Sequence, residues 1–218
     1  MKPATIIIAV ALLPAVLQAS ADNKGTRVPQ AKDVSTIVSD NDAIFDYTID
    51  RNVTHPKVGS GQRQQIVEFQ RKQAKELIEK GFVVESTRND EVLVVTIEAE
   101  RLFMPNDTLL RVSSQPLLRQ FTHFLDKQLW KMLLVMYADN TGSNNYLKEL
   151  SVKRVDAVYD WFDAKCNHTE QLVPYGLGNY NPLLPNNSID NRRKNRRLEI
   201  FLIPNENMIK LAKDNKLK

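Results

Sequence analysis

The chain has 218 residues, with 30 Lys and Arg against 26 Asp and Glu and a net charge of +4 at pH 7. This length suits one domain with extensions, and the small basic excess weakly favours acidic surroundings. Cys166 is the only cysteine, so an internal disulfide is excluded. We expect this side chain to be a packing residue rather than a nucleophile.

Residues 1–21 have the pattern of a secretory signal peptide. Lys2 is followed by the apolar run "ATIIIAVALLPAVLQ" and then by the small residues Ala19, Ser20 and Ala21. The run is shorter than the ~20 apolar residues that span a membrane, and Pro14 interrupts it, so an uncleaved anchor is the less favoured alternative. The sequence has no cysteine near the cleavage site, so we do not expect a lipid-anchored lipoprotein. We therefore expect export, with no membrane-spanning segment in the mature chain.

A linker and an extension are predicted to follow. Residues 22–61 are polar without a sustained period, which indicates a linker or a loosely ordered segment. Residues 62–101 are predicted to form a helix over 62–80, stopped at Gly81, and then a β-hairpin that turns at 88–90. The apolar stripe of the helix consists of Ile66, Phe69, Ala74, Leu77 and Ile78. A partner helix could cover this stripe, but packing against its own domain is the favoured interpretation.

Residues 102–204 alternate between helix and strand patterns. The expected elements are a helix over 114–129, a strand over 130–138, a helix over 145–166, a strand and loop over 171–187 and a strand over 198–204. The first helix would bury Leu117, Leu118, Phe121, Phe124 and Leu125, and the strand over 130–138 is apolar enough to be central in its sheet. This order predicts an α/β sandwich with helices packed on one mixed sheet. Residues 205–218 form a basic tail, expected to be frayed or a short helix.

One arginine interrupts the apolar side of the helix over 145–166. On a wheel of roughly 100° per residue, Arg154 falls between Leu150 and Val158, inside the apolar arc. The opposite side carries Glu149, Lys153, Asp156, Asp160 and Asp163. Either Arg154 lays its stem on the core and reaches water, or its guanidinium is buried and needs a partner, because an unpaired buried charge is unfavourable.

Asp139 stands where the central strand ends and the turn "NTGSNN" begins. Gly142 would supply the tight turn, and Asn144 or Asn145 would cap the returning helix. This turn would bring Asp139 to the helix N-terminus, where backbone N–H groups point outward. An acid, an arginine and N–H donors around one site suit a small zwitterion, with its ammonium on Asp139 and its carboxylate on Arg154.

The region from about Leu102 to Pro204 resembles the OmpA-like periplasmic domain, the peptidoglycan-binding module of outer-membrane and flagellar-stator proteins. The stretches that carry this resemblance are "RLFMPNDTLL", "YADNTGSNNYLKELSVKRVDAV", "PYGLGNYNPLLPNN" and "NRRKNRRLEI". Their order and spacing match across roughly half of the chain. The resemblance implies a β-α-β-α-β domain that binds peptidoglycan without catalysis and without a cofactor.

The resemblance also implies site residues and a ligand. In that family an aspartate after the central strand and an arginine on the next helix hold diaminopimelate of the stem peptide, and these positions fall on Asp139 and Arg154. The family's final basic motif falls on Asn195, Arg196 and Arg197. A structural Arg–carboxylate pair is an equal alternative for Arg197. The predicted peptidoglycan-binding residues are Asp139, Arg154, Thr141, Asn145, Arg192 and Arg196.

The chain departs from the family pattern at two places. Met136, Tyr137 and Ala138 stand where the family usually has Gly-His-Thr, and Leu147 follows Tyr146 where an asparagine is usual. These changes could weaken the site or alter which peptide it accepts. The alternative function is therefore a scaffold that has lost its ligand and acts through protein contacts. An exposed, unpaired Asp139 and Arg154 would favour the binding site, and an internal salt bridge that fills the pocket would favour the scaffold.

Other functional classes find little support in the sequence. His55, His123 and His168 are scattered, and Cys166 with His168 makes only a weak zinc pair, so neither an enzyme nor a metal site is expected. The run "RRKNRR" alone suggests nucleic acid, which an exported protein seldom meets. We expect a periplasmic protein of a diderm bacterium that tethers the cell wall to the outer membrane or to a partner, for instance an outer-membrane protein.

Overall fold

The computed structural model describes residues 57–218 and the backbone of residues 32 and 33. The predicted signal peptide, most of the predicted linker and His55 lie outside these residues. No helix among residues 57–218 is long and apolar enough to cross a membrane.

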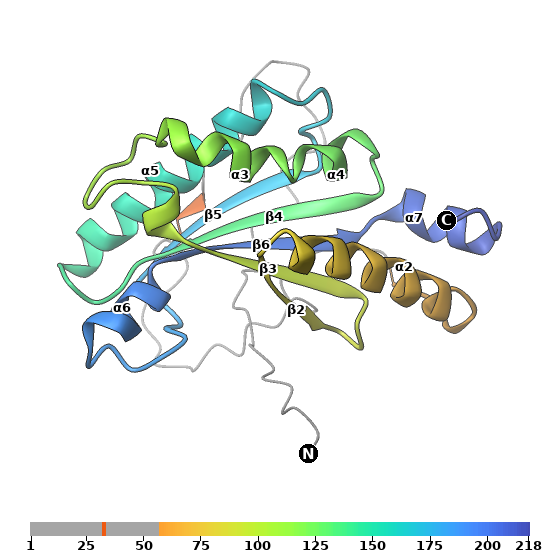
Figure 1. Ribbon diagram of the computed structural model, residues 1–218, viewed down its shortest axis with the longest axis horizontal. Helices are drawn as coiled ribbons and strands as arrows, with labels where there is room; N and C mark the ends of the chain where they lie inside the picture. Colours follow the sequence, from red (N-terminus) through yellow and green to blue (C-terminus); the bar gives the residue numbers. More distant parts are fainter. Residues whose placement is uncertain (1–31, 34–56) are drawn as a thin grey trace.

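One mixed sheet organises the described chain (Figure 1). Its strands, in the order β1-β5-β4-β6-β3-β2, are Lys32–Asp33, Leu172–Gly178, Trp130–Tyr137, Arg197–Pro204, Val92–Glu98 and Val83–Thr87. β4 pairs parallel with β5 and antiparallel with β6, and β3 runs antiparallel to both β6 and β2. The expected central position of the strand over 130–138 is therefore confirmed, as is the α/β architecture with helices on one mixed sheet.

The predicted extension belongs to the same sheet and the same core as the rest of the domain. Its helix is α2, Ser60–Glu79, and its hairpin is β2 and β3, with Arg88, Asn89 and Asp90 all at positive φ in the turn. Buried Gln70 fixes α2 to the sheet, because its side-chain nitrogen donates to the carbonyls of Glu91 and Leu202 at 2.8 and 3.1 Å. Packing of α2 on its own domain is thus confirmed.

The predicted apolar stripe of α2 agrees only in part with the residues that the structure buries. Ile66, Phe69 and Leu77 are buried, but Ile78 is 54% exposed. Gln70 and Gln73 take buried positions on the core side instead, and the indole of Trp130 donates to the Gln70 side-chain oxygen at 2.9 Å. A buried amide that satisfies backbone groups of the sheet is not visible in an apolar pattern.

The helix expected over 114–129 is two short helices, which is a correction to the sequence prediction. α3 spans Gln115–Arg119 and α4 spans Thr122–Asp126, after the 3-10 turns η3 (Ala99–Arg101) and η4 (Val112–Ser114). The amide of Phe121 donates to the carbonyl of Leu118, and that of Phe124 to Phe121, so the chain winds with three residues per turn at the break. This winding keeps Leu118, Phe121 and Phe124 on one line facing the core, where all three are buried.

The crossover helix α5, Asn144–Asp163, lies on the sheet between β4 and β5. Its apolar arc is buried as predicted, except that Trp161 is only partly covered. The close approach to β5 requires glycine, since a Cβ at Gly176 would lie 2.4 Å from the backbone nitrogen of Val152. The amide of Gly178 donates to the Ser151 hydroxyl at 2.8 Å. These contacts hold α5, at Ser151 and Val152, against the carboxyl end of β5.

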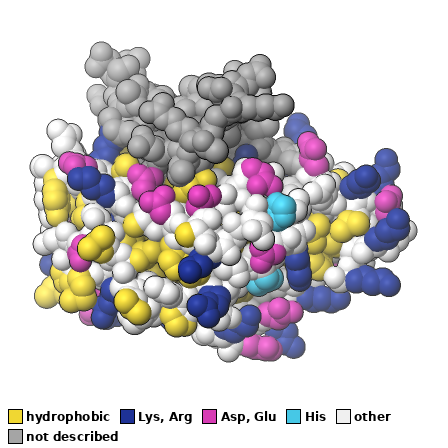
Figure 2. All heavy atoms as spheres, turned by 90° about the horizontal axis from the view of Figure 1, so that it is seen from above, with side chains coloured by type: hydrophobic (Ala, Val, Ile, Leu, Met, Phe, Trp, Pro, Cys, Tyr) yellow, Lys and Arg dark blue, Asp and Glu magenta, His cyan; other side chains and the backbone are white. Residues whose placement is uncertain are grey.

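Two more helices complete the described chain. α6, Ile189–Asn195, covers most of the run "NRRKNRR", for which half strand was expected, so only Arg197 of that run lies in β6. α7, Glu206–Lys213, forms the predicted tail helix, capped by Asn205, and it packs against α2 through a face that includes buried Met208 and Ala212. Lys and Arg side chains gather at the end of the molecule where α2 and α7 lie (Figure 2).

The two faces of the sheet differ in what packs on them. The larger apolar cluster combines residues of α2, α4, α5 and α7 with alternate residues of β3, β4 and β6. The smaller cluster lies on the other face and consists of strand residues: Val92, Val94, Leu133, Val135, Tyr137, Tyr175, Leu177, Phe201 and Ile203. Arg197 and Glu199 are fully buried beside this second cluster, with the Arg197 guanidinium 3.7 Å from the centre of the Tyr137 ring.

Candidate ligand-binding site

A cavity of about 160 Å³ opens beyond the carboxyl end of β4. It is lined by the end of β4, the first half of α5, the turn after β3 and the residue that precedes β6. The charged lining residues are Glu100, Asp139, Arg154 and Arg196, and the others are Ala99, Phe103, Met104, Pro105, Asn106, Ala138, Thr141, Tyr146, Leu147 and Leu150. Four of the six predicted site residues, Asp139, Thr141, Arg154 and Arg196, therefore meet in one cavity.

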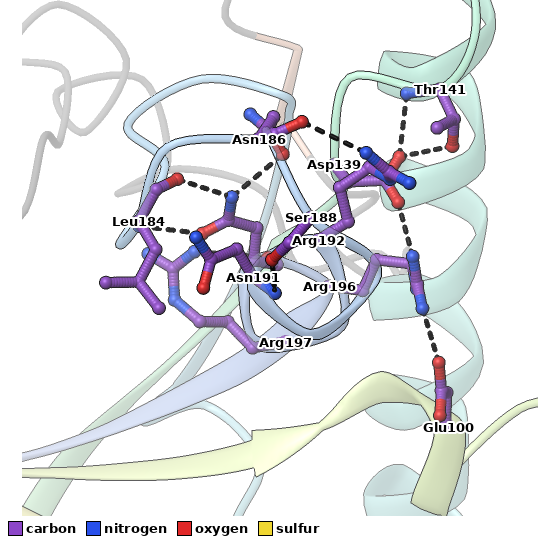
Figure 3. Close-up of polar contacts among 11 residues, drawn as sticks. Glu100, Asp139, Thr141, Leu184, Asn186, Ser188, Asn191, Arg192, Arg196 and Arg197 are labelled. Atoms are coloured by element: carbon purple, nitrogen blue, oxygen red, sulfur yellow. Dashed lines mark hydrogen bonds and ion pairs between the residues drawn. The ribbon is translucent and has the colours of Figure 1, made fainter.

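Asp139 is held as a charged carboxylate at the base of the turn. Only 1% of the residue is exposed, and its Oδ1 accepts hydrogen bonds from the backbone N–H of Thr141, at 2.8 Å, and from the Thr141 hydroxyl. Its Oδ2 accepts from Arg196 (Figure 3). Burial acts to raise the pKa of Asp139, but the Thr141 bonds and the Arg196 charge outweigh it and hold the pKa below its ordinary value.

Arg154 is buried without a carboxylate. Only 5% of the residue is exposed, so of the two alternatives that the helical wheel left open, the buried arginine is the one observed. Its Nε donates to the carbonyl of Asp107 at 2.8 Å and its Nη2 to that of Met104 at 3.1 Å, and its guanidinium lies 5.0 Å from the centre of the Phe103 ring. Within residues 57–218 no ion pair reaches Arg154, and burial lowers its pKa. A guanidinium carries five N–H donors, so carbonyls leave donors for a ligand in the cavity.

Arg196 bridges two carboxylates. One terminal nitrogen pairs with Asp139 and the other with Glu100 (Figure 3). The sheet register explains this meeting: Glu98 of β3 faces Arg197 of β6, and the next amide, that of Ala99, donates to the Arg196 carbonyl at 2.9 Å. Burial alone would lower the pKa of Arg196, but the two acids raise it above its ordinary value.

The other predicted residues lie outside the cavity lining. Asn145 is exposed in the first turn of α5, which is capped by Ser143 and not by either asparagine: the Ser143 hydroxyl oxygen accepts from the Tyr146 amide at 3.3 Å. A serine one residue earlier satisfies the same helix N–H groups, so sequence alone could not choose among them. Arg192 donates to the carbonyl of Asn186 at 3.1 Å, within the loop that precedes α6.

Arg197 takes the structural role that was left open for it. Its Nε donates to Glu199 at 2.7 Å, and both side chains are fully buried in the sheet. Asn195 likewise fixes the chain, since its side chain exchanges hydrogen bonds with the backbone of Leu184 at 2.8 and 3.0 Å. Arg196 is thus flanked by two anchored residues, and it alone of the three lines the cavity.

Neither Glu100 nor the carbonyls of Met104 and Asp107 were foreseen as parts of this site. Glu100 comes three residues before Phe103 in the stretch "ERLFMPND", so its position was visible, but its partner depends on the β3–β6 register. A backbone carbonyl leaves no side-chain signal in the sequence.

The structure offers no metal site among residues 57–218, where no group of three or more His, Cys, Asp or Glu side chains could hold an ion. Cys166 is buried, and burial raises the pKa of its thiol to about 11. His168, the other member of the weak zinc pair considered from the sequence, has its Nδ1 3.6 Å from Oε1 of Glu170.

Solved structures with this arrangement are periplasmic and cell-wall-anchoring domains. A putative MotB-like protein from Desulfovibrio vulgaris superposes with a TM-score of 0.57 at 24% identity, covering 66% of this chain and 98% of that one. The cell wall anchor of the type VI secretion system from Pseudomonas aeruginosa gives a TM-score of 0.53 at 26% identity, over 64% and 96% of the two chains. The resemblance to the OmpA-like periplasmic domain is thereby confirmed.

Relatives found by sequence match a shorter part of the chain than the solved structures do. The peptidoglycan-binding protein ArfA of Mycobacterium tuberculosis is 39% identical over 66 residues, which is 30% of this chain and 20% of that protein. The probable lipoprotein YiaD of Escherichia coli is 31% identical over 71 residues, 33% of this chain and 32% of that protein. The chain thus spans less than a third of the length of these relatives. No family model matches. The names of ArfA and of the Pseudomonas aeruginosa structure describe peptidoglycan binding and cell wall anchoring.

Proposed function

We propose that this domain binds the stem peptide of peptidoglycan without catalysis, with one zwitterionic centre of diaminopimelate in the cavity. Arg154 carries the proposal. Only 5% of the Arg154 residue is exposed, and its guanidinium donates to two carbonyls and pairs with no carboxylate among residues 57–218. Such a group is a strong anion-binding group, because a buried charge without an ion-pair partner gains most from a carboxylate.

The ammonium of the ligand is assigned to Asp139. Oδ1 of Asp139 is fully used by Thr141, whereas Oδ2 has one charged partner, Arg196, and can accept a second donor from the cavity. The ammonium would share Oδ2 with Arg196 while the adjacent carboxylate meets Arg154. Leu147 and Leu150 line the same cavity and would contact the aliphatic chain of the ligand.

A periplasmic, wall-associated location fits this chemistry. The relative ArfA is named as a peptidoglycan-binding protein and the Pseudomonas neighbour as a cell wall anchor. Together with the predicted export signal, these names support a protein that tethers the wall to the outer membrane or to a partner in the periplasm. Arg154 forms no ion pair among residues 57–218, which favours the binding site, whereas Asp139 is salt-bridged to Arg196 inside the cavity, which favours the scaffold, so the scaffold stays the alternative function.

Co-sedimentation with purified diaminopimelate-type sacculi tests the proposal. The mature protein should sediment, and Asp139→Ala and Arg154→Ala should each lose binding by roughly tenfold to a hundredfold, the equivalent of about 1.5–3 kcal/mol for a charged hydrogen bond. Lys153→Ala is the matched control, since it removes a charge from the neighbouring exposed position of α5, where Lys153 pairs with Glu149. Equal sedimentation of all four proteins, or none by the parent, would overturn the proposal and favour the scaffold.

A further inference from the structure

The charges that line the cavity leave room for one ligand carboxylate. Asp139, Arg196 and Glu100 form a chain in which two carboxylates share one guanidinium, so this trio carries one net negative charge. Arg154 forms no ion pair with any member of the trio, its hydrogen bonds go to carbonyls, and it carries one positive charge. The cavity therefore presents one negative and one positive subsite, which matches a zwitterion and not a dianion.

Asp107 and Arg111 are charged residues beside the cavity, and of these Asp107 acts electrostatically on Arg154. The Asp107 carboxylate accepts hydrogen bonds from the backbone N–H groups of Thr108 and Leu109, at 2.7 and 3.0 Å, within its own turn. Arg111 donates to the backbone carbonyl of Glu100 at 3.0 Å. Neither residue lines the cavity, and their charges are opposite in sign.

Glu100 pairs with the terminal nitrogen of Arg196 that Asp139 leaves open, so Arg196 has no unpaired terminal nitrogen left for a ligand carboxylate. Without Glu100, Arg196 would keep only Asp139, one terminal nitrogen would turn to the cavity, and a second ligand carboxylate would find a cationic partner. The Glu100 side chain is 46% exposed and lines the cavity, where its carboxylate would repel an approaching ligand carboxylate.

We infer that Glu100 is a specificity-determining residue, which makes the site prefer a stem peptide whose second diaminopimelate carboxyl is amidated over one in which it is free. This inference rests on the proposed function. The preference is electrostatic and involves a half-exposed group, so we expect it to be about threefold to tenfold at low ionic strength and to shrink as salt is added.

Calorimetric titration with two peptides tests the inference. Both are diaminopimelate-containing stem peptides with one free ammonium–carboxylate centre, and they differ only in whether the other diaminopimelate carboxyl is free or amidated. The parent should bind the amidated form more tightly, and Glu100→Gln should abolish or reverse that preference, mainly by binding the free form better. Glu98→Gln is the matched control, because Glu98 pairs with Arg193 at 3.8 Å outside the cavity, and it should keep the parental preference.

The outcomes separate the two proposals. A parent that binds both peptides without preference, or a Glu100→Gln variant that keeps the preference of the parent, overturns the role of Glu100 and leaves peptidoglycan binding in place. A parent that binds neither peptide overturns both. Thermal unfolding of each variant should show midpoints close to that of the parent, since Glu98 and Glu100 both lie at the edge of the core.

Discussion

Two buried arginines of this protein have opposite surroundings. Arg197, on the sheet face away from the helices, is fully buried with Glu199 at 2.7 Å and lies against the ring of Tyr137. Arg154, on the helix side, has only the carbonyls of Met104 and Asp107 and faces a cavity. Burial alone therefore does not mark a ligand site. The useful distinction is whether the protein itself supplies the counter-charge.

The largest loss of stability is expected from substitution of Arg197, because the protein itself supplies its counter-charge, Glu199. Arg197→Met leaves the Glu199 carboxylate buried without its cation, so the free energy of unfolding should fall by about 3–5 kcal/mol. Urea denaturation followed by circular dichroism measures this change. The double variant Arg197→Met with Glu199→Leu should recover much of the loss, because no charge is then left unpaired. A single variant as stable as the parent would remove the basis for contrasting the two arginines.

Arg154→Met should affect binding more than folding. The variant loses two hydrogen bonds to carbonyls, which destabilises the fold, but it also removes a buried charge that has no ion-pair partner, which stabilises the fold. These two contributions oppose each other, so the free energy of unfolding should change by no more than about 1 kcal/mol. Affinity for a stem peptide should fall roughly tenfold to a hundredfold, as measured by calorimetry. Destabilisation as large as that of Arg197→Met would mean that Arg154 is a structural residue.

Lowering the pH should reduce the stability of the folded protein by protonating Asp139. The pKa of this carboxyl is held below its ordinary value of 3.8 in the folded protein, so its ionised form contributes stability that is present above about pH 4. That contribution is lost as the pH falls through the lower, folded pKa. The parent should therefore lose more stability between pH 6 and pH 3 than Asp139→Asn does, in parallel urea titrations. Equal losses would show that Asp139 is not held in its charged form.

The smallest effect is expected at predicted residues that the cavity does not include. Arg192 bonds the Asn186 carbonyl, and Asn145 is exposed at the start of α5. Arg192→Ala and Asn145→Ala should each change stem-peptide affinity by less than about threefold, since neither side chain lines the cavity. A loss from either variant as large as that from Arg154→Met would extend the site beyond the cavity.

Local patterns in the sequence predicted much of the fold. The run over 130–138 is apolar apart from Lys131 because β4 is buried on both faces, and Arg154 was recognised inside the helical arc because α5 is a regular helix. The break between α3 and α4 was missed, since apolar residues at 118, 121 and 124 fit either an α-helix or a tighter winding. Ile78 was misplaced because buried Gln70 and Gln73 define the core side of α2.

The partners within the site could not be predicted in the same way. Asp139 and Arg154 were expected to face one ligand, and both line the cavity, but the ion pair from Asp139 to Arg196 and on to Glu100 joins residues 57 and 96 positions apart. Such pairs depend on the register of β3 with β6 and on the cap of α6. A sequence shows which charges exist, whereas three-dimensional pairing decides which one is left for a ligand.

The most direct test observes both arginines during one titration. With arginine side chains labelled by ¹³C and ¹⁵N, and signals assigned from Arg154→Met and Arg197→Met spectra, a diaminopimelate-containing stem peptide is added stepwise. The guanidinium signal of Arg154 should move and saturate, while that of Arg197 stays in place. An Arg154 signal that does not move at saturating peptide would contradict the claim that the uncompensated arginine is the ligand site.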